Sequence, residues 1–278
     1  MIDFPNCKIN LGLNITAKRQ DGYHDLETVF YPIPLEDVLE IVPRQQTDGT
    51  THKYTLKQYG NAIDCDPEKN LAVKAYKLLD DIYGLPPTDI FLHKSIPSGA
   101  GLGGGSADAA FMLRMLDTVY HINIGTRQLE EYAARLGADC AFFVQDKPAF
   151  ATGIGDMLEP IELDLHGWQI VIVKPDIFVS TKEAFAGISP QKPCRSLKDI
   201  IKMPVSEWRE LMVNDFEESI FPQHPEIKAI KDAMYSWGAT YASMSGSGSS
   251  VYGLFPHNAS LPDLTSLNKN DFCFTATL

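Results

Sequence analysis

The residues best suited to chemistry form a run of small amino acids between Pro97 and Ala110. Five glycines occur between Gly99 and Gly105, and the residues after them are typical of a helix that ends near Tyr120. Glycine-rich backbone costs conformational entropy, so such a loop usually lets the main chain approach a ligand closely. A helix that begins directly after it points free N–H groups and its positive dipole end at that ligand. The run therefore predicts an anion site, most naturally for phosphate.

None of three known phosphate-binding patterns matches this run fully. The P-loop pattern fails because no Lys-Ser or Lys-Thr pair follows the glycines. The dinucleotide pattern GxGxxG matches at Gly99, Gly101 and Gly104, but no clear βαβ unit and no acidic strand end accompany it. The protein-kinase loop fails because the chain has no His-Arg-Asp or Asp-Phe-Gly sequence. The alternative without a ligand is a flexible glycine loop.

Other polar side chains are candidates for the same site. Lys8 and Asn10 share one face of a predicted strand, where a solvated surface is an equal alternative. Asp139 follows Gly137, and by itself this favours an ordinary turn aspartate. Residues 243–250 are serine and glycine with one methionine, which predicts either a hairpin turn or a second ligand-contacting loop.

Hydrophobic periodicity indicates which elements must position these residues. Alternation predicts a half-buried strand at residues 7–15, and further strands are predicted at 38–42, 54–58, 90–94, 168–173, 240–244, 250–255 and 272–278. Helices are predicted from Pro67 to a stop at Gly84, through residues 104–120, from a Thr126 cap to Gly137, and at 206–220 and 225–237. A strand, then helices, then returning strands in the second half predicts an α+β domain there.

Composition excludes several classes of protein. The chain has 278 residues, 44% of them hydrophobic, which is enough for a substantial core. No apolar run approaches the roughly 20 residues of a membrane span. A net charge of −12 argues against non-specific binding to nucleic acid or to an anionic membrane surface.

The cysteines and the N-terminal residues predict a cytoplasmic protein. An odd number of cysteines without a CxxC pair fits neither a disulfide framework nor a zinc site, so free thiols are expected. No basic segment followed by an apolar one opens the sequence, so no secretory signal is expected. The cysteines are Cys7, Cys65, Cys140, Cys194 and Cys273.

Three motifs in chain order resemble those of the galacto-, homoserine, mevalonate and phosphomevalonate (GHMP) kinases. Residues 97–110 resemble their ATP-binding signature, residues 8–13 their first motif and residues 244–248 their third. The resemblance implies a two-domain α+β fold. Its N-terminal domain, like domain 2 of ribosomal protein S5, would cover residues 1–158, and a ferredoxin-like domain would cover 159–278. ATP and substrate would bind in the cleft between these domains.

Finer motifs resemble one member of this family. Residues 21–28, 102–106 and 136–139 are similar to the member that phosphorylates the 2-hydroxyl of a cytidine diphosphate polyol in the non-mevalonate isoprenoid pathway. Two positions depart from the pattern. Cys140-Ala141 stands where members more often have Val-Pro, which would shift the backbone behind Asp139, and Ala107 replaces a second serine that would offer a hydroxyl to phosphate.

The resemblance implies a role for each site residue. Asp139 would accept or orient the hydroxyl proton, and Lys8 would keep Asp139 ionised and stabilise developing negative charge. Ser106 is the candidate contact for Mg²⁺, which would arrive with the nucleotide. ATP would contact Pro97, Gly99, Gly101, Leu102, Gly103, Gly104, Gly105 and Ser106, with Asn70 and Leu71 on the adenine side.

The substrate would contact a second set of residues. Tyr23 and Phe185 would stack on the cytidine ring and His24 would bond to its edge. Lys94 would reach the diphosphate, with a solvated lysine as the alternative. Asn10 would bond to the polyol, and Thr181 completes the set. Lys8, Lys94 and a helix N-terminus would thus make a positive pocket inside an acidic protein.

Three alternatives stay open on the sequence. Another GHMP kinase, acting on mevalonate or homoserine, would have no ring to stack on Tyr23 and Phe185. A non-catalytic nucleotide-binding module would not need Lys8 and Asp139. A nicotinamide-dependent oxidoreductase would share only the glycine pattern.

Overall fold

The computed structural model describes residues 1–44, 53–61, 66–264 and 267–278. The chain forms two compact units, neither of which is a single stretch of sequence. Unit 1 consists of Met1–Cys7, Leu35–Ser98 and Gly103–Asp146, and unit 2 consists of Lys8–Pro34, Gly99–Leu102 and Lys147–Leu278. The family's domain boundary at residue 158 stays a prediction.

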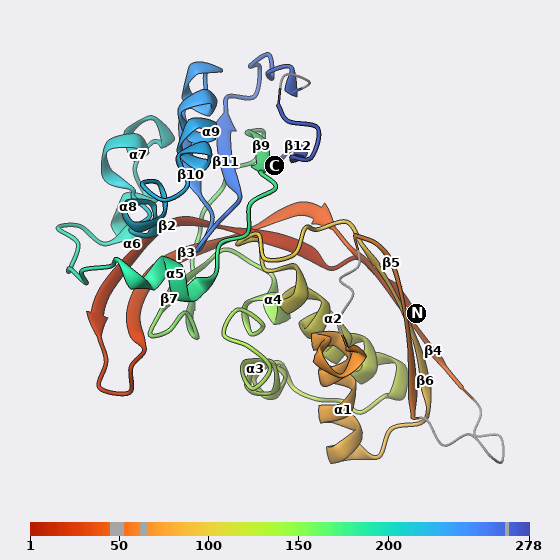
Figure 1. Ribbon diagram of the computed structural model, residues 1–278. Coiled ribbons are helices and arrows are strands. Elements are labelled where there is room, and N and C mark those ends of the chain that lie inside the picture. The colour runs from red at the N-terminus through yellow and green to blue at the C-terminus, as the bar shows by residue number, and fades with distance from the viewer. Residues whose placement is uncertain (45–52, 62–65, 265–266) are drawn as a thin grey trace. The chain divides into compact units, whose positions relative to one another are not determined.

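Unit 1 is built on a four-stranded sheet with the order β1-β4-β6-β5. Strand β4 (Val38–Pro43) is antiparallel to both of its neighbours, β1 (Ile2–Asp3) and β6 (Thr88–Lys94), whereas β5 (Tyr54–Gly60) runs parallel to β6. The helices of the unit lie together on one side of this sheet, as Figure 1 shows. Leu39 and Ile41 of β4 and Ile90 and Leu92 of β6 are fully buried, so they form the sheet's part of the core.

The helices of unit 1 follow local capping signals. The chain passes through a 3₁₀ turn, η1 (Pro67–Lys69), into α1 (Leu71–Tyr83), whose N-cap Asn70 accepts a hydrogen bond from the N–H of Ala72. Gly84 ends α1 in the left-handed conformation that glycine adopts without strain. Helix α2 packs against α1 and is followed by two shorter helices. These are α2 (Gly104–Tyr120), α3 (Thr126–Ala134) and α4 (Phe142–Gln145).

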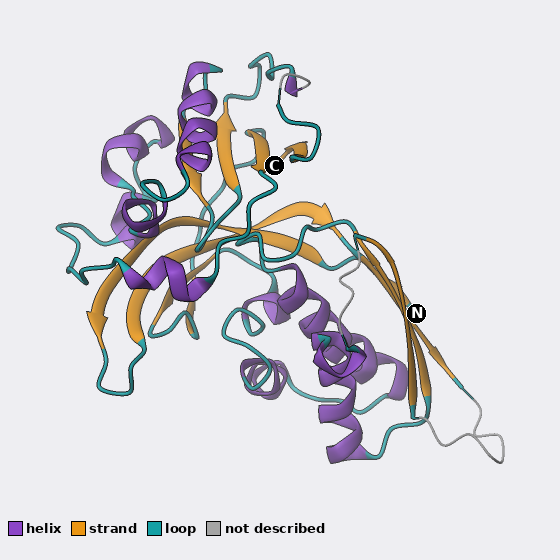
Figure 2. Cartoon of the chain, in the orientation of Figure 1, coloured by secondary structure: helices purple, strands orange, loops and turns teal. Residues whose placement is uncertain are grey.

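Unit 2 contains the other two sheets, each with four strands. One has the antiparallel order β10-β11-β9-β12, and Figure 2 shows helices beside it. Its strands are β9 (Gln169–Lys174), β10 (Tyr241–Met244), β11 (Val251–Phe255) and β12 (Phe272–Thr277). The other has the order β2-β3-β7-β8, with β2 (Asn6–Lys18), β3 (His24–Glu36), β7 (Ala149–Thr152) and β8 (Met157–Pro160).

Strand β9 lies inside its sheet, between β11 and β12, and its central residues have no exposed surface. Ile170, Val171, Ile172 and Val173 are all fully buried, as expected for a run of β-branched residues covered on both faces. The helices of unit 2 are α5 (Thr181–Ala186), α6 (Leu197–Ile200), α7 (Val205–Leu211), α8 (Phe216–Ile220) and α9 (Pro225–Ser236). Helix α9 packs on β10 and β11.

The elements predicted from periodicity are confirmed with shifted ends, apart from two errors in the helices. Each of the eight predicted strands overlaps an observed one, and the helices at 104–120 and 225–237 are present. The helix predicted from Pro67 begins only at Leu71, because residues 67–69 form a separate 3₁₀ turn and Asn70 is extended. Thr126 is not a cap, because Gly125 occupies the N-cap position and Thr126 is the first helical residue.

The predicted helix at residues 206–220 is wrong, since the structure divides it into α7 and α8. Between them the backbone pairs with β2: Leu13 donates to the carbonyl of Val213, and Asp215 donates to the carbonyl of Leu13. Asn214 is buried there and donates to the carbonyls of Met244 and Gly246. These long-range bonds outweigh the local helical preference.

Strands β1, β3, β7 and β8 were not predicted. Strand β3 contains Pro32 and Pro34, which cannot donate to a ladder and argue against a central strand. In the structure its ladder with β7 involves Thr28, Val29 and Phe30, so the prolines lie outside that ladder.

Two further expectations concern membranes and thiols. Within the described residues, none of the helices is long and apolar enough to cross a bilayer. No disulfide joins the four described cysteines, Cys7, Cys140, Cys194 and Cys273, whereas Cys65 lies outside the described residues.

Candidate active site

Lys8 and Asn10 lie on β2 and are buried, so the solvated-face alternative is wrong. The ammonium of Lys8 donates to Asn10 Oδ1 at 2.6 Å and to the carbonyl of Gly101 at 3.2 Å. It also lies 4.9 Å from the centre of the Phe30 ring. A charge that is only 3% exposed is costly unless it is paired or bonded, and these contacts fix its position beside the glycine loop.

The third motif meets the glycine loop at the same residue. Ser245 Oγ donates to the carbonyl of Gly101 at 2.8 Å and accepts from the N–H of Asn10 at 3.2 Å. Gly101 has a φ of +76°, and a Cβ built on it would lie 1.9 Å from the carbonyl oxygen of Ser245. The first motif, the glycine loop and the third motif therefore converge on Gly101, and only glycine fits there.

Residues 245–250 connect β10 and β11, so the predicted hairpin turn is confirmed. Asn214 holds this turn through its bonds to the carbonyls of Met244, at 2.8 Å, and Gly246, at 2.9 Å. No local signal pointed to this role, because Asn214 lay inside a predicted helix. The contact of the turn with a ligand stays a prediction.

In unit 1 the loop leads into α2 as a helix N-terminus suited to an anion. Gly103 is the N-cap with a φ of 74°, and no side chain caps the helix there. The first-turn N–H groups are thus available to a ligand. A Cβ on Gly105 would lie 3.7 Å from Leu71 Cδ1, so the predicted adenine-side residue Leu71 lies beside the start of α2.

The turn that carries Asp139 lies close to the same helix start. Cys140, the next residue, is buried, and its thiol lies near enough to Ser106 for this residue to affect its pKa. Burial raises the pKa of Cys140 to about 11, Ser106 lowers it and the charge of Asp139 raises it, so the thiol is neutral at pH 7. Cys140 therefore adds no second negative charge beside Asp139. The contact between Lys8 and Asp139 stays a prediction.

The residues predicted to hold the cytidine ring are partly brought together in unit 2. The His24 ring stacks on the Phe185 ring, with centres 4.7 Å apart and planes at 17°. The ring of Phe216 meets Phe185 edge-on at 4.8 Å. Tyr23 is 62% exposed, and Thr181 is exposed at the start of α5. His24 and Phe216 both contact the Phe185 ring, so a base that stacks on Phe185 must share or displace these contacts.

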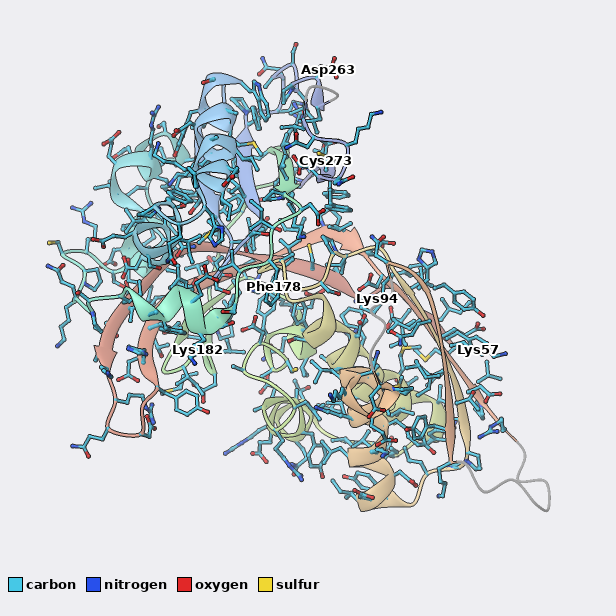
Figure 3. All side chains as sticks on the ribbon, in the orientation of Figure 1. Lys57, Lys94, Phe178, Lys182, Asp263 and Cys273 are labelled. Carbon is cyan, nitrogen blue, oxygen red and sulfur yellow. The ribbon has the colours of Figure 1, made fainter. Side chains whose placement is uncertain are left out.

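Phe178 is a neighbour of the glycine loop that the sequence reasoning missed. Its side chain, labelled in Figure 3, is 72% exposed. A Cβ on Gly99 would lie 3.0 Å from Phe178 Cε2, so the ring lies directly against the loop. The available signal was an aromatic residue shortly before Ser180 and Thr181.

Lys94 lies in a buried ion cluster, so it is not the solvated lysine that was the alternative. Its ammonium donates to Asp37 and, at 2.6 Å, to Asp108 Oδ2. The three residues are at most 6% exposed. Burial alone would lower the pKa of Lys94, but the charges of Asp108 and Asp37 raise it overall. The contact of Lys94 with a substrate diphosphate stays a prediction, and these carboxylates would compete with it.

Changing Asp108 to asparagine should alter how stability depends on pH. Burial raises the pKa of Asp108 to about 7, against the charge of Lys94 and with the support of Asp37. An unfolded carboxyl titrates near 4, so between about pH 4 and 7 the folded protein binds more protons than the unfolded chain. The contribution of Asp108 to the unfolding free energy is therefore complete at acidic pH and falls as pH rises, by up to about 1.4 kcal/mol per unit.

An asparagine at position 108 does not titrate. Urea unfolding measured between about pH 4 and 7 should therefore show the unfolding free energy of the wild type falling, relative to that of Asp108→Asn, as the pH rises. A difference in unfolding free energy that did not change with pH would contradict the expectation.

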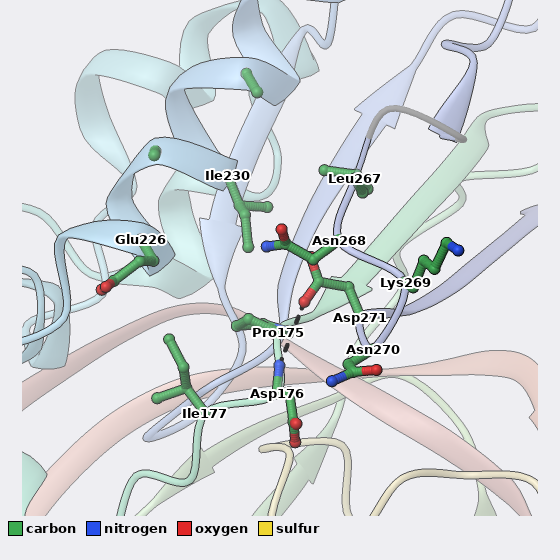
Figure 4. A pocket seen from close by; sticks show the side chains of 12 residues that line it. Pro175, Asp176, Ile177, Glu226, Ile230, Leu267, Asn268, Lys269, Asn270 and Asp271 are labelled. Atoms are coloured by element: carbon green, nitrogen blue, oxygen red, sulfur yellow. Dashed lines mark hydrogen bonds between the residues drawn. The ribbon is translucent and has the colours of Figure 1, made fainter.

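A pocket of about 770 Å³ lies elsewhere in unit 2, and Figure 4 shows it from close by. Its walls come from the end of β9, from α9 and from residues 267–271. The N–H of Asp176 donates to Asp271 Oδ1 at 3.3 Å beside it. None of the lining residues belongs to the predicted site, so the pocket plays no part in the arrangement above.

Comparisons with known proteins agree with these motifs. Residues 70–153 match the GHMP kinases N terminal domain, and residues 196–266 match the GHMP kinases C terminal domain. The chain is 59% identical to a 4-diphosphocytidyl-2-C-methyl-D-erythritol kinase of Bacteroides thetaiotaomicron, over 100% of both chains. It is 46% identical to the protein of that name in Cytophaga hutchinsonii, over 92% of each.

Solved structures give the same result. A crystal structure of a 4-(cytidine 5'-diphospho)-2C-methyl-D-erythritol kinase matches with a TM-score of 0.78 and 33% identity, covering 91% of this chain and 90% of that one. The mevalonate kinase of Methanococcus jannaschii matches with a TM-score of 0.73, covering 100% of this chain and 98% of that one, but at 15% identity it shows the shared fold alone. The chain has the two-domain GHMP kinase fold, and it belongs to the 4-diphosphocytidyl-2-C-methyl-D-erythritol kinases within the GHMP kinase family.

Proposed function

We propose that the protein transfers the terminal phosphoryl group of ATP to the 2-hydroxyl of 4-diphosphocytidyl-2-C-methyl-D-erythritol, a step of the non-mevalonate isoprenoid pathway. The observation that carries this proposal is the 59% identity with a relative of that name over its whole length. The convergence of three motifs on Gly101 supports it. A cytoplasmic location stays a prediction from the sequence.

Phosphoryl transfer asks the protein for positioning and for charge stabilisation. The N–H groups of the glycine loop and of the first turn of α2 would bind the triphosphate. Lys8, whose ammonium is fixed by Asn10 and the carbonyl of Gly101, would stabilise negative charge as the phosphoryl group moves. Asp139 would accept the proton of the substrate hydroxyl or orient that hydroxyl.

Asn10 was predicted to bond to the substrate polyol, but its contacts are better suited to orienting Lys8. Its Oδ1 accepts from Lys8 and its Nδ2 donates to Thr28 Oγ1 at 2.9 Å, so both ends of the amide have protein partners. A hydrogen bond from Asn10 to the polyol would have to share these atoms. We therefore infer that its main contribution is to the position of the ammonium.

Mg²⁺ would enter with ATP as part of the substrate. Within the described residues, no group of three or more His, Cys, Asp or Glu side chains is placed to hold a metal ion. Ser106, half-buried at the start of α2, is the residue that fits as a contact, and when bound the ion would neutralise phosphate charge.

A substrate panel with detection of ADP tests the proposal. With Mg²⁺ and ATP, the purified protein should release ADP only when 4-diphosphocytidyl-2-C-methyl-D-erythritol is added. Turnover with mevalonate or homoserine instead would show that the protein is a GHMP kinase with another substrate. ATP binding without turnover of any alcohol would indicate a non-catalytic nucleotide-binding module.

Phe185→Ala should weaken substrate binding selectively. Loss of an aromatic stacking partner costs about 1–3 kcal/mol per base, so KM for the cytidine substrate should rise about 5- to 100-fold while KM for ATP changes little. Phe185→Tyr keeps the ring and serves as the matched variant. Equal KM values for the alanine variant and the wild type would remove Phe185 from the cytidine site.

A further inference from the structure

The buried ion cluster of unit 1 joins the two ends of the glycine loop. Asp37 lies between β3 and β4, Lys94 ends β6 and Asp108 lies on α2. Lys94 is labelled in Figure 3. Burying three charged groups is expensive, and a cluster of this kind is weak evidence for stability by itself.

On the incoming side of the loop, Asp37 binds backbone directly. Its Oδ1 accepts hydrogen bonds from the N–H of Ser95 at 2.6 Å and from the N–H of Ile96 at 2.9 Å. Ile96 immediately precedes Pro97, the first residue of the predicted ATP-binding run. Because hydrogen bonds to a charged acceptor are the strong ones, this carboxylate fixes the direction in which the chain enters the loop.

On the outgoing side, Lys94 connects the same carboxylate to α2. Its ammonium bridges Asp37 and Asp108, and Asp108 lies one turn beyond the Gly104 start of the helix. Asp37, Lys94 and Asp108 thus connect the backbone before the loop with the helix after it. A Cβ on Gly104 would lie 2.8 Å from Ile96 Cγ2, which shows how closely these two ends approach.

One carboxylate oxygen of the cluster is buried at a cost in stability. Asp108 Oδ1 is buried, and within the described residues it has no hydrogen-bond partner. An unsatisfied buried acceptor costs about 1–3 kcal/mol in mutational series. Features that cost stability tend to concentrate at functional sites.

We propose that Asp37, Lys94 and Asp108 form a clamp that positions both ends of the glycine loop and so sets the affinity of the protein for ATP. This inference rests on the proposed function, since it takes ATP as the ligand of the loop. Asp37 is the central positioning residue, because it contacts both the loop backbone and Lys94. Loss of the clamp should therefore weaken ATP binding far more than it lowers turnover at saturating ATP.

Asp37→Ala and Asp37→Asn test the clamp in the full-length protein. Titration calorimetry with ATP and Mg²⁺ should show a Kd raised about tenfold or more by Asp37→Ala, and raised less by Asp37→Asn, whose amide oxygen still accepts from Ser95 and Ile96. The turnover number at saturating ATP should stay within about threefold of wild type.

Asp80→Ala is the matched control. It removes the ion pair of Asp80 with Lys53, also in unit 1, without touching the loop, so Kd should not change. An equal rise in Kd for Asp80→Ala, or an unchanged Kd for Asp37→Ala, would overturn the proposal. If Asp37→Ala does not fold, Asp37→Asn and Asp108→Asn decide, and wild-type Kd values for both would overturn it.

Amide hydrogen exchange separates the clamp from the proposed function. In the absence of ATP, Asp37→Ala should speed exchange at residues 95–106 and leave α9 unchanged. A wild type that binds no ATP would end the proposed function, and the clamp would then be judged by exchange alone. Unchanged exchange at residues 95–106 would overturn the clamp whatever the ligand.

Discussion

Replacing Asp139 with alanine should lower the turnover number about 10²- to 10⁴-fold, the range that a positioned general base contributes. The KM for ATP should change little, because the proposed role of Asp139 concerns the acceptor hydroxyl. The local structure supports this role, since Cys140, the residue after Asp139, lies near Ser106 at the start of α2. Steady-state kinetics with varied ATP and varied cytidine substrate measure both constants.

Asp139→Asn separates the charge of the residue from its shape and should lose nearly as much activity as the alanine variant. Asp164→Ala is the control, because Asp164 is an exposed turn aspartate that accepts from the N–H of His166. It should leave the kinetics unchanged. A turnover number for Asp139→Ala close to that of the wild type would show that Asp139 is not the base.

Lys8→Met extends the same experiment. If Lys8 and Asp139 act on one hydroxyl, the Lys8→Met/Asp139→Ala double variant should lose less than the product of the two single losses, because residues that act as a unit are non-additive. Strictly multiplicative losses would indicate two independent roles.

Gly101→Ala should have the second large effect, because the loop has no room for a methyl group at this position. The new Cβ would lie 1.9 Å from the carbonyl oxygen of Ser245, and the φ of +76° is unfavourable for alanine. The loop must therefore move away from Ser245, which breaks the hydrogen bonds that the carbonyl of Gly101 accepts from Lys8 and Ser245. A misplacement of about 1 Å can cost about 100-fold, so kcat/KM for ATP should fall by at least that factor.

Gly84→Ala separates the clash from backbone strain. Gly84 has a similar φ of +67°, but apart from its chain neighbours no atom of the described residues lies within 4 Å of its ideal Cβ position. Gly84→Ala should lower the free energy of unfolding by about 1–2 kcal/mol, because alanine is disfavoured in the left-handed conformation, and it should leave the kinetic constants unchanged. The comparison requires thermal unfolding and steady-state kinetics of both Gly101→Ala and Gly84→Ala. Equal kinetic effects of the two variants would mean that strain, and not the contact with Ser245, is responsible.

Much of the fold followed from local sequence signals. The β-branched run at Ile170–Val173 and the helix from Leu71 to Gly84 were predictable because a buried strand and a capped helix each have a local signature. The helix at 206–220 failed because residues 213–215 pair with Leu13, some 200 positions earlier. No local pattern reports such a partner.

Three short motifs in chain order were enough to predict the family, a glycine loop and a lysine, and the finer motif at residues 136–139 added the aspartate proposed for phosphoryl transfer. The partners of these residues became visible only in the folded chain: Gly101 is the residue at which Lys8 and Ser245 meet, and Lys94 belongs to a buried cluster with Asp37 and Asp108. Hydrogen bonds and ion pairs act over a few ångströms in space, whereas these partners are far apart along the chain, so no local pattern reports them.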